Sequence, residues 1–275
     1  MSTEELREQT TDLRKHPQFH SNLLKDDRDL VVYLPEQYGS EGHEGEHYPV
    51  LYLQDGQNLF DPTTSYVGVD WHVDKTAEVL IEHHFIQPLI VVGIYNTGPK
   101  RIDEYTPTRD PRRRSGGYAD LYGRMITEEI MPFINDQYRT LQGPENTGLG
   151  GSSLGGLVSL YLGLQRPDVF GKLAVMSPSV WWNNRAILNF IDEFSVPKPE
   201  LKIWLDIGTA EGATALPDAR LLRKRLIERG WRQGEDLQYY EVKGATHSEA
   251  AWADRVGPML HYLFPADASS ASLGK

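Results

Sequence analysis

A serine flanked by glycines is the residue in this chain with the clearest potential for chemistry. Gly151-Ser152-Ser153-Leu154-Gly155 matches the pattern G-x-S-x-G, in which the serine occupies a very tight turn between a strand and a helix. The residues two before and two after the serine press against each other in such a turn, so a side chain on either would clash. The pattern therefore predicts that Ser153 stands exposed, where its hydroxyl can attack an electrophile.

The residues around this motif favour the strand, turn and helix that it requires. Gly148-Leu149-Gly150 can end a buried strand, and apolar residues then recur with helical spacing from 154 to 164. A glycine-rich and serine-rich loop that only links two elements is the alternative, because the chain contains 25 glycines. The flanking pattern favours the catalytic interpretation.

A serine hydroxyl is a weak nucleophile until a base takes its proton, so the chain must also supply partners for it. Where the serine lies on this kind of turn between a strand and a helix, an acid and then a histidine follow it along the chain, and each lies in a loop after a late strand. His247 lies in the loop 243–249, directly after the last predicted strand at 237–242. We expect His247 to be the base.

Three carboxylates are candidates for the acid that would orient this imidazole. Glu211 lies in the loop after the predicted strand 201–207 and is the preferred candidate. Asp206 lies within that strand and is expected to accept hydrogen bonds from the backbone. Asp218 is expected near the start of the next helix, where an acidic residue suits the helix dipole. The prediction is Glu211, and the two aspartates remain open.

Two backbone N–H groups are needed to bind the negative charge that develops on a carbonyl oxygen under attack. Leu154 supplies one of them, because it directly follows the serine. Gln57 is the candidate for the other, since Asp55-Gly56-Gln57 follows the early central strand predicted at 49–53. A plain turn at the end of that strand is the alternative.

The order of the predicted elements indicates the fold class. An antiparallel hairpin, with strands at 19–24 and 29–34, comes first, and strands alternate with helices from residue 49 onward. This order predicts an α/β fold with a mostly parallel central sheet and helices on both faces. We expect a single domain over 18–264, a polar N-terminal arm over 1–17, and a disordered Ala/Ser-rich tail over 265–275.

The composition excludes several classes of function. The 275 residues carry a formal net charge of −11, which argues against a nucleic-acid partner because phosphate binding requires a basic surface. The chain has no cysteine, so disulfides and thiolate metal sites are excluded. No apolar run approaches the ~18 residues of a membrane span, and the N-terminal residues lack the pattern of a signal peptide. We therefore expect a cytoplasmic protein with no membrane partner.

Two adjacent tryptophans are candidates for substrate binding. Trp181 and Trp182 follow the strand predicted at 173–176, where an aromatic face could stack on a sugar or on a phenolic acyl group. The alternative is that a tryptophan here packs in the core. We expect one tryptophan in each of these roles.

A long polar segment, 96–117, supplies further candidates for substrate binding. Arg101, Glu104 and Tyr105 lie on it, and the segment could cover the site. A surface loop held by ion pairs is the alternative.

With these residues in place, the chain resembles the putative-esterase family of α/β hydrolases. That family contains enterochelin-type siderophore esterases, feruloyl and acetyl carbohydrate esterases, S-formylglutathione hydrolases and mycolyltransferases. The resemblance covers about residues 25–264, looks closest to the siderophore-esterase and carbohydrate-esterase branch, and is carried by five blocks of sequence: 50–61, 101–107, 151–157, 177–182 and 244–252.

This resemblance implies the α/β-hydrolase fold and a role for each candidate residue. Ser153 would be the nucleophile, His247 the base, and the N–H groups of Gln57 and Leu154 the oxyanion hole. Glu211 stands where many relatives carry aspartate, so the acid is the position at which the chain departs from the family pattern. The family implies neither a metal nor an organic cofactor.

The predicted function is that of a serine carboxylesterase, which forms an acyl-enzyme with a small-molecule ester. The expected substrate is an acylated sugar, a hydroxycinnamate ester or a siderophore-type ester. An acyltransferase that uses the same residues and a noncatalytic binding domain on the same scaffold are the two alternatives. The sequence does not determine the oligomeric state.

Overall fold

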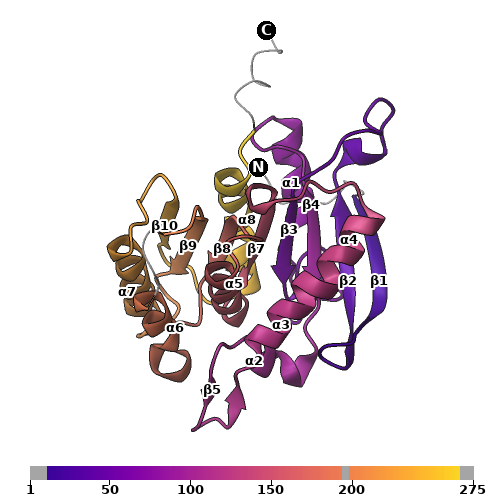
Figure 1. Ribbon diagram of the computed structural model, residues 1–275. Helices are drawn as coiled ribbons and strands as arrows, with labels where there is room; N and C mark the ends of the chain where they lie inside the picture. Colours follow the sequence, from indigo (N-terminus) through magenta and orange to yellow (C-terminus); the bar gives the residue numbers. More distant parts are fainter. Residues whose placement is uncertain (1–10, 194–197, 267–275) are drawn as a thin grey trace.

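A single large sheet forms the centre of the molecule (Figure 1). The computed structural model describes residues 11–193 and 198–266, and within these ranges eight strands join in this sheet. Their order across the sheet is β1 (Asp12–Ser21), β2 (Asp26–Leu34), β4 (Ile90–Ile94), β3 (Val50–Gln54), β7 (Thr147–Ser152), β8 (Lys172–Met176), β9 (Lys202–Gly208) and β10 (Leu237–Val242).

The pairing of these strands confirms the predicted fold class. β2 pairs antiparallel with both β1 and β4, and every pair from β4 to β10 is parallel. The parallel strands therefore end at the same edge of the sheet, which is where ligands collect in open α/β folds. The chain has a mostly parallel sheet with an antiparallel hairpin at its N-terminus, as the sequence predicted.

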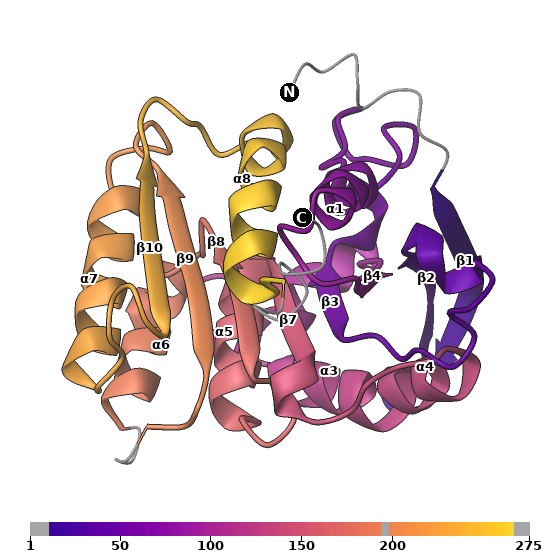
Figure 2. The same cartoon turned by 90° about the horizontal axis from the view of Figure 1, so that it is seen from above.

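Helices cover both faces of the sheet (Figure 2). On one face lie α1 (Val73–Glu82) and α8 (Glu249–Leu263), which pack against each other. The other face carries α3 (Ala119–Met125), α4 (Met131–Gln137), α5 (Leu154–Gln165), α6 (Trp182–Asp192) and α7 (Ala215–Glu228). A π-helical turn, Ile126–Ile130, joins α3 to α4.

Burial on both faces explains why the central strands read as continuous apolar runs. Every residue of β3 and β4 is buried, and so is every residue of β7. Two apolar clusters result, one on each side of the sheet. Among the described residues, no helix has both the length and the apolar character to cross a membrane.

The N-terminal hairpin begins earlier than predicted. β1 starts at Asp12 rather than residue 19, so residues 12–17 belong to the sheet and not to a polar arm. Their side chains are largely exposed at the sheet edge, and the pairing of their backbone with β2 is not visible as an apolar pattern. Leu23 and Leu24 lie in the turn, where Leu24 N–H donates to Ser21 Oγ (3.0 Å). The rest of the predicted arm, residues 1–10, lies outside the described residues.

The polar segment 96–117 has more regular structure than the predicted loop. It contains a short helix, α2 (Arg101–Glu104), and a small hairpin of β5 (Arg109–Asp110) and β6 (Ser115–Gly116). Asp103 of α2 ties the helix to this hairpin, because its carboxylate accepts a hydrogen bond from Gly116 N–H (2.5 Å). The tail was predicted over residues 265–275, of which 267–275 lie outside the described residues. At its start, Ala266 N–H donates a hydrogen bond to Phe85 O (3.2 Å).

Candidate active site

The turn between β7 and α5 holds Ser153 in a strained backbone conformation. Its φ and ψ are 58° and −121°, a region that residues with a side chain rarely adopt. Ser153 N–H donates to Met176 O (3.0 Å), which anchors the turn to the neighbouring strand. A Cβ on Gly151 would lie 3.1 Å from the carbonyl carbon of Gly155. The close approach of the two glycines is therefore as the sequence predicted.

The structure brings Ser153, His247 and Glu211 together at the carboxyl edge of the sheet. Ser153 Oγ lies 3.0 Å from His247 Nε2, and His247 Nδ1 lies 2.8 Å from Glu211 Oε2. The loops after β9 and β10 are tied to each other, since Ala210 N–H donates to Ala245 O (3.0 Å). In this arrangement the imidazole can take a proton from the hydroxyl while the carboxylate holds the ring in the required tautomer.

The surroundings of Glu211 favour its ionised form. Burial alone would raise the pKa of Glu211, but hydrogen bonds from His247, Ser177 and the Gly208 N–H outweigh it, and the pKa is lowered. Ser177 Oγ donates to Glu211 Oε1 (2.5 Å), and Gly208 N–H donates to the same oxygen (2.7 Å). The carboxylate is only 1% exposed, so these donors replace water and fix its orientation.

The two aspartates that the sequence left open lie elsewhere. Asp206 is fully buried in β9 and accepts hydrogen bonds from Arg255 Nη1 (2.6 Å) and Trp204 Nε1 (2.7 Å). It also accepts from Ser177 N–H (3.2 Å), in agreement with the predicted backbone contact. Asp218 lies in the first turn of α7 and pairs with Arg185 (2.6 Å). Of the three carboxylates, Glu211 is the one that contacts His247.

The two predicted oxyanion donors differ in how they relate to the serine, because Leu154 directly follows Ser153 in the chain and Gln57 comes from the loop after β3. Leu154 is the first residue of α5, and the first N–H groups of a helix have no partner within it. Gln57 lies in the 3-10 turn η2 (Gly56–Asn58) after β3 and lines the same cavity as Ser153. Asp55 adopts a left-handed conformation (φ 58°), which turns the chain sharply at the strand end.

Gly56 allows this turn to lie against the backbone of β4. A Cβ at this position would lie 2.5 Å from the carbonyl carbon of Gly93 and 2.7 Å from Ile94 N, neither of which can move without displacing the strand. We expect Gly56→Ala to destabilise the protein by about 1–3 kcal/mol and to lower kcat by displacing Gln57 N–H. Thermal unfolding and ester turnover would measure the two effects.

Gly39→Ala is the matched control for this substitution, because nothing lies within 4 Å of a Cβ built on Gly39. The control should leave the melting temperature and turnover near their wild-type values. Equal stability and turnover in Gly56→Ala and the wild type would contradict the tight approach of η2 to β4.

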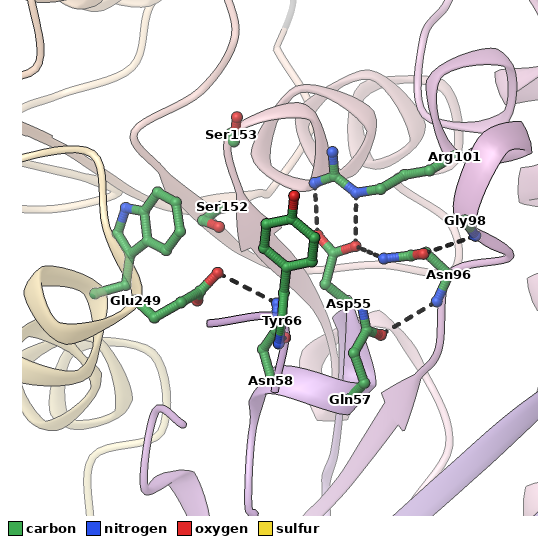
Figure 3. Close-up of a pocket in the computed structure, with 11 residues that line it drawn as sticks. Asp55, Gln57, Asn58, Tyr66, Asn96, Gly98, Arg101, Ser152, Ser153 and Glu249 are labelled. Carbon is green, nitrogen blue, oxygen red and sulfur yellow. Dashed lines mark hydrogen bonds and ion pairs between the residues drawn. The ribbon is translucent and has the colours of Figure 1, made fainter. Parts of the chain in front are cut away.

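A cavity of about 400 Å³ opens beside Ser153 (Figure 3). Arg101 from the segment 96–117 lines it. Its Nε and Nη2 each lie 2.7 Å from an oxygen of Asp55. Burial alone would lower the pKa of Arg101, but the charge of Asp55 and its hydrogen bonds raise it. Apart from Gly98, the remaining lining residues are polar or aromatic: Gln57, Asn58, Tyr66, Asn96, Ser152, Glu249 and Trp252.

Two of the predicted substrate-binding residues are structural instead. Glu104 is buried and pairs with Arg28 (3.1 Å), which ties α2 to the N-terminal hairpin. Tyr105 is fully buried, stands 5.1 Å from the ring of Tyr122, and accepts a hydrogen bond from Asp55 N–H (3.3 Å). Neither Glu104 nor Tyr105 lines the cavity in the described part of the chain. Their polar character reflects buried pairing rather than contact with solvent or ligand.

One of the two tryptophans lies in the core and the other is accessible to solvent. Trp182 is buried, and its Nε1 donates to Thr108 O (2.8 Å). Trp181 is 40% exposed, and the guanidinium of Arg113 lies 4.9 Å from its ring centre. Neither is part of the cavity lining in the described part of the chain. A substrate at Ser153 would have to extend beyond the cavity to reach Trp181.

Sequence reasoning missed the contribution of α8 to the site. Glu249 and Trp252 lie in its first turn and line the cavity, and the Trp252 ring stands edge-on to His247 with 4.8 Å between centres. The signal was their position two and five residues after the histidine, at the start of a helix. Ser177 was also missed, although it contacts Glu211, Trp252 and Arg255.

Comparison with known proteins gives the family. The family model described as "Putative esterase" matches residues 21–263. The uncharacterized protein YbbA of Bacillus subtilis is 26% identical over 86% of this chain and 92% of its own length. The ferri-bacillibactin esterase BesA of the same organism is 31% identical over 73% of both chains.

A solved structure of a ferulic acid esterase superposes on this chain with a TM-score of 0.74. The two share 18% sequence identity over 93% of this chain and 99% of the other, a similarity that shows the fold. The sequence matches, which extend over most of the chain, show the family itself. The chain belongs to the putative-esterase family and is a carboxylic ester hydrolase of the α/β-hydrolase fold.

Proposed function

We propose that this protein hydrolyses its ester substrate through an acyl-enzyme on Ser153. The observation that carries the proposal is the continuous hydrogen-bond chain from Ser153 Oγ through His247 to Glu211, with distances of 3.0 and 2.8 Å. A hydroxyl, an imidazole and an ionised carboxylate in this order are the groups that nucleophilic acyl transfer requires.

The reaction begins when Ser153 Oγ attacks the ester carbonyl carbon and His247 Nε2 takes the hydroxyl proton. The carbonyl oxygen becomes an oxyanion, which accepts hydrogen bonds from the N–H groups of Leu154 and Gln57. Glu211 stabilises the imidazolium that has formed. The tetrahedral intermediate then collapses, the bond to the alcohol oxygen breaks, and His247 gives its proton to the leaving alcohol.

Water completes the cycle by attacking the acyl group on Ser153. His247 takes a proton from the water, a second oxyanion forms in the same N–H pair, and the bond to Ser153 Oγ breaks as the proton returns to it. The carboxylic acid leaves and the serine is regenerated. The two half-reactions together consume one ester and one water molecule.

The substrate we propose is an acylated sugar, a hydroxycinnamate ester or a siderophore-type ester. The bacillibactin esterase among the relatives and the ferulic acid esterase among the structural neighbours support these classes. The cavity supports a small organic ester, since its volume is about 400 Å³ and its lining combines polar groups with the rings of Tyr66 and Trp252.

Rapid mixing with a 4-nitrophenyl ester tests the acyl-enzyme. We expect a burst of nitrophenol close to one equivalent per enzyme if deacylation is slower than acylation, and acid quenching should trap an acyl mass on the peptide that contains Ser153. Acyl mass on another peptide would contradict the proposal. Products formed with added sugar or alcohol would separate hydrolysis from acyl transfer, and a panel of acetyl, feruloyl and catecholate esters would identify the acyl group.

A further inference from the structure

A second carboxylate, outside the hydrogen-bonded chain of Ser153, His247 and Glu211, faces the cavity. Glu249 is the first residue of α8 and follows Ser248, whose hydroxyl accepts a hydrogen bond from Ala251 N–H (3.4 Å) and caps the helix. Glu249 lines the same cavity as Ser153. Figure 3 shows its side chain directed toward Asn58 and Tyr66, on the side of the cavity opposite Arg101. The reaction proposed above gives Glu249 no role.

The protein holds Glu249 in place with neutral donors. One oxygen accepts a hydrogen bond from Trp71 Nε1, and the other accepts one from Asn58 Nδ2 (3.3 Å). Burial raises the pKa of Glu249, and the hydrogen bond from Trp71 offsets this in part. In the described ranges, no Lys, Arg or His side chain lies within ion-pair distance of its carboxylate. Its negative charge is therefore not neutralised by direct contact.

The other charges of the cavity cancel each other. Arg101 and Asp55 form a two-pronged ion pair in which both contacts measure 2.7 Å. Such a pair has little net charge when seen from across a cavity, because the opposite charges lie close together. Glu249 then contributes the unbalanced charge, and its effect is strong because the site is partly shielded from water.

We propose that Glu249 selects substrates by charge, admitting neutral or positively charged groups to the cavity and disfavouring esters that place a negative charge beside it. A carboxylate with two oxygens also accepts hydrogen bonds, so hydroxyl or ammonium groups on the substrate suit it. This inference rests on the proposed hydrolysis at Ser153. Among the proposed substrates it favours a neutral acylated sugar or hydroxycinnamate ester over an iron-loaded catecholate, which is an anion.

Matched esters that differ only in charge test the proposal. The acyl set consists of 4-nitrophenyl adipamate, 4-nitrophenyl hydrogen adipate and 4-nitrophenyl 6-aminohexanoate, which are neutral, anionic and cationic. The alcohol set consists of the butyrate esters of glycolamide, glycolate and choline, which are neutral, anionic and cationic. Their hydrolysis is measured by the release of butyric acid. In one of the two sets the charged end of the ester enters the cavity. For that set, Glu249→Gln should raise the ratio of kcat/KM for the anionic ester to kcat/KM for the neutral ester by roughly tenfold, because the variant removes a like charge at short range.

Two further variants separate charge from structure. Glu249→Asp keeps the charge and should retain the wild-type ratio, even if the shorter side chain weakens the contact with Trp71. Glu41→Gln removes an exposed charge elsewhere and should also leave the ratio unchanged. An unchanged ratio in Glu249→Gln for both sets, or a ratio in Glu249→Asp that matches Glu249→Gln, would overturn the charge selection. Failure of the wild type to hydrolyse any neutral ester would instead overturn the proposed function.

Discussion

Replacement of Ser153 by alanine is expected to lower kcat for a 4-nitrophenyl ester by a factor on the order of 10⁵. The substitution removes the oxygen that would form the acyl bond, while the two N–H donors and the cavity stay in place. The residual rate should come from those groups alone. Steady-state turnover measures the loss, and circular dichroism with thermal unfolding should show that the fold is retained.

Ser179→Ala is the matched control, because Ser179 Oγ lies 3.2 Å from Ser153 Oγ and is an alternative hydroxyl within hydrogen-bond distance. We expect this variant to retain kcat to within about tenfold, since a single neutral hydrogen bond is worth only ~1 kcal/mol. A fluorophosphonate probe should label the wild type and Ser179→Ala but not Ser153→Ala. Full turnover by Ser153→Ala, or loss of labelling only in Ser179→Ala, would refute the assignment of Ser153.

Glu211→Gln is expected to lower kcat by roughly 10³–10⁴-fold with a much smaller change in KM. Glutamine can keep the contact with His247 Nδ1 through either its oxygen or its nitrogen. It carries no charge to stabilise the imidazolium, and its N–H₂ group would favour the wrong tautomer of the ring. The loss should therefore fall on the chemical step, which single-turnover kinetics can separate from binding.

The two aspartates that the sequence left open supply the controls. Asp218→Asn removes the contact with Arg185 of α6 and should leave kcat within about twofold, because neither residue is among those that line the cavity. Asp206→Asn leaves the buried Arg255 with only a longer carboxylate contact, to Glu211 (3.7 Å), and should lower the stability by about 3–5 kcal/mol. A folded Asp206→Asn that lost turnover as completely as Glu211→Gln, or a Glu211→Gln with wild-type kcat, would contradict the choice of Glu211.

Much of the fold could be predicted because its signals are local. The apolar runs of β3 and β4 show strands covered on both faces, and the predicted strand 237–242 agrees with β10 (Leu237–Val242). The predicted start of β1 was wrong because the side chains of its first residues are polar and largely exposed. Edge strands of this kind are held by backbone pairing, which leaves no periodic pattern in the sequence.

The candidate site could be predicted only in part. Glu104 and Tyr105 sat on a polar segment and were expected near the substrate, but they are buried. The reason is that their partners come from distant parts of the chain: Arg28 lies 76 residues from Glu104, and Asp55 lies 50 residues from Tyr105. Pairing at such separations depends on how the segments pack, and no local pattern carries it.

Sequence alone determined where the reactive groups would gather. The glycines around Ser153 require a tight turn, and the order of strands and helices places that turn and the loops of Glu211 and His247 at one edge of a parallel sheet. Only the tertiary structure decided that Glu211 reaches His247 and that Glu249 enters the cavity. Those outcomes depend on side-chain contacts of a few ångströms between separate loops, whereas turn geometry and strand order are properties of the chain itself.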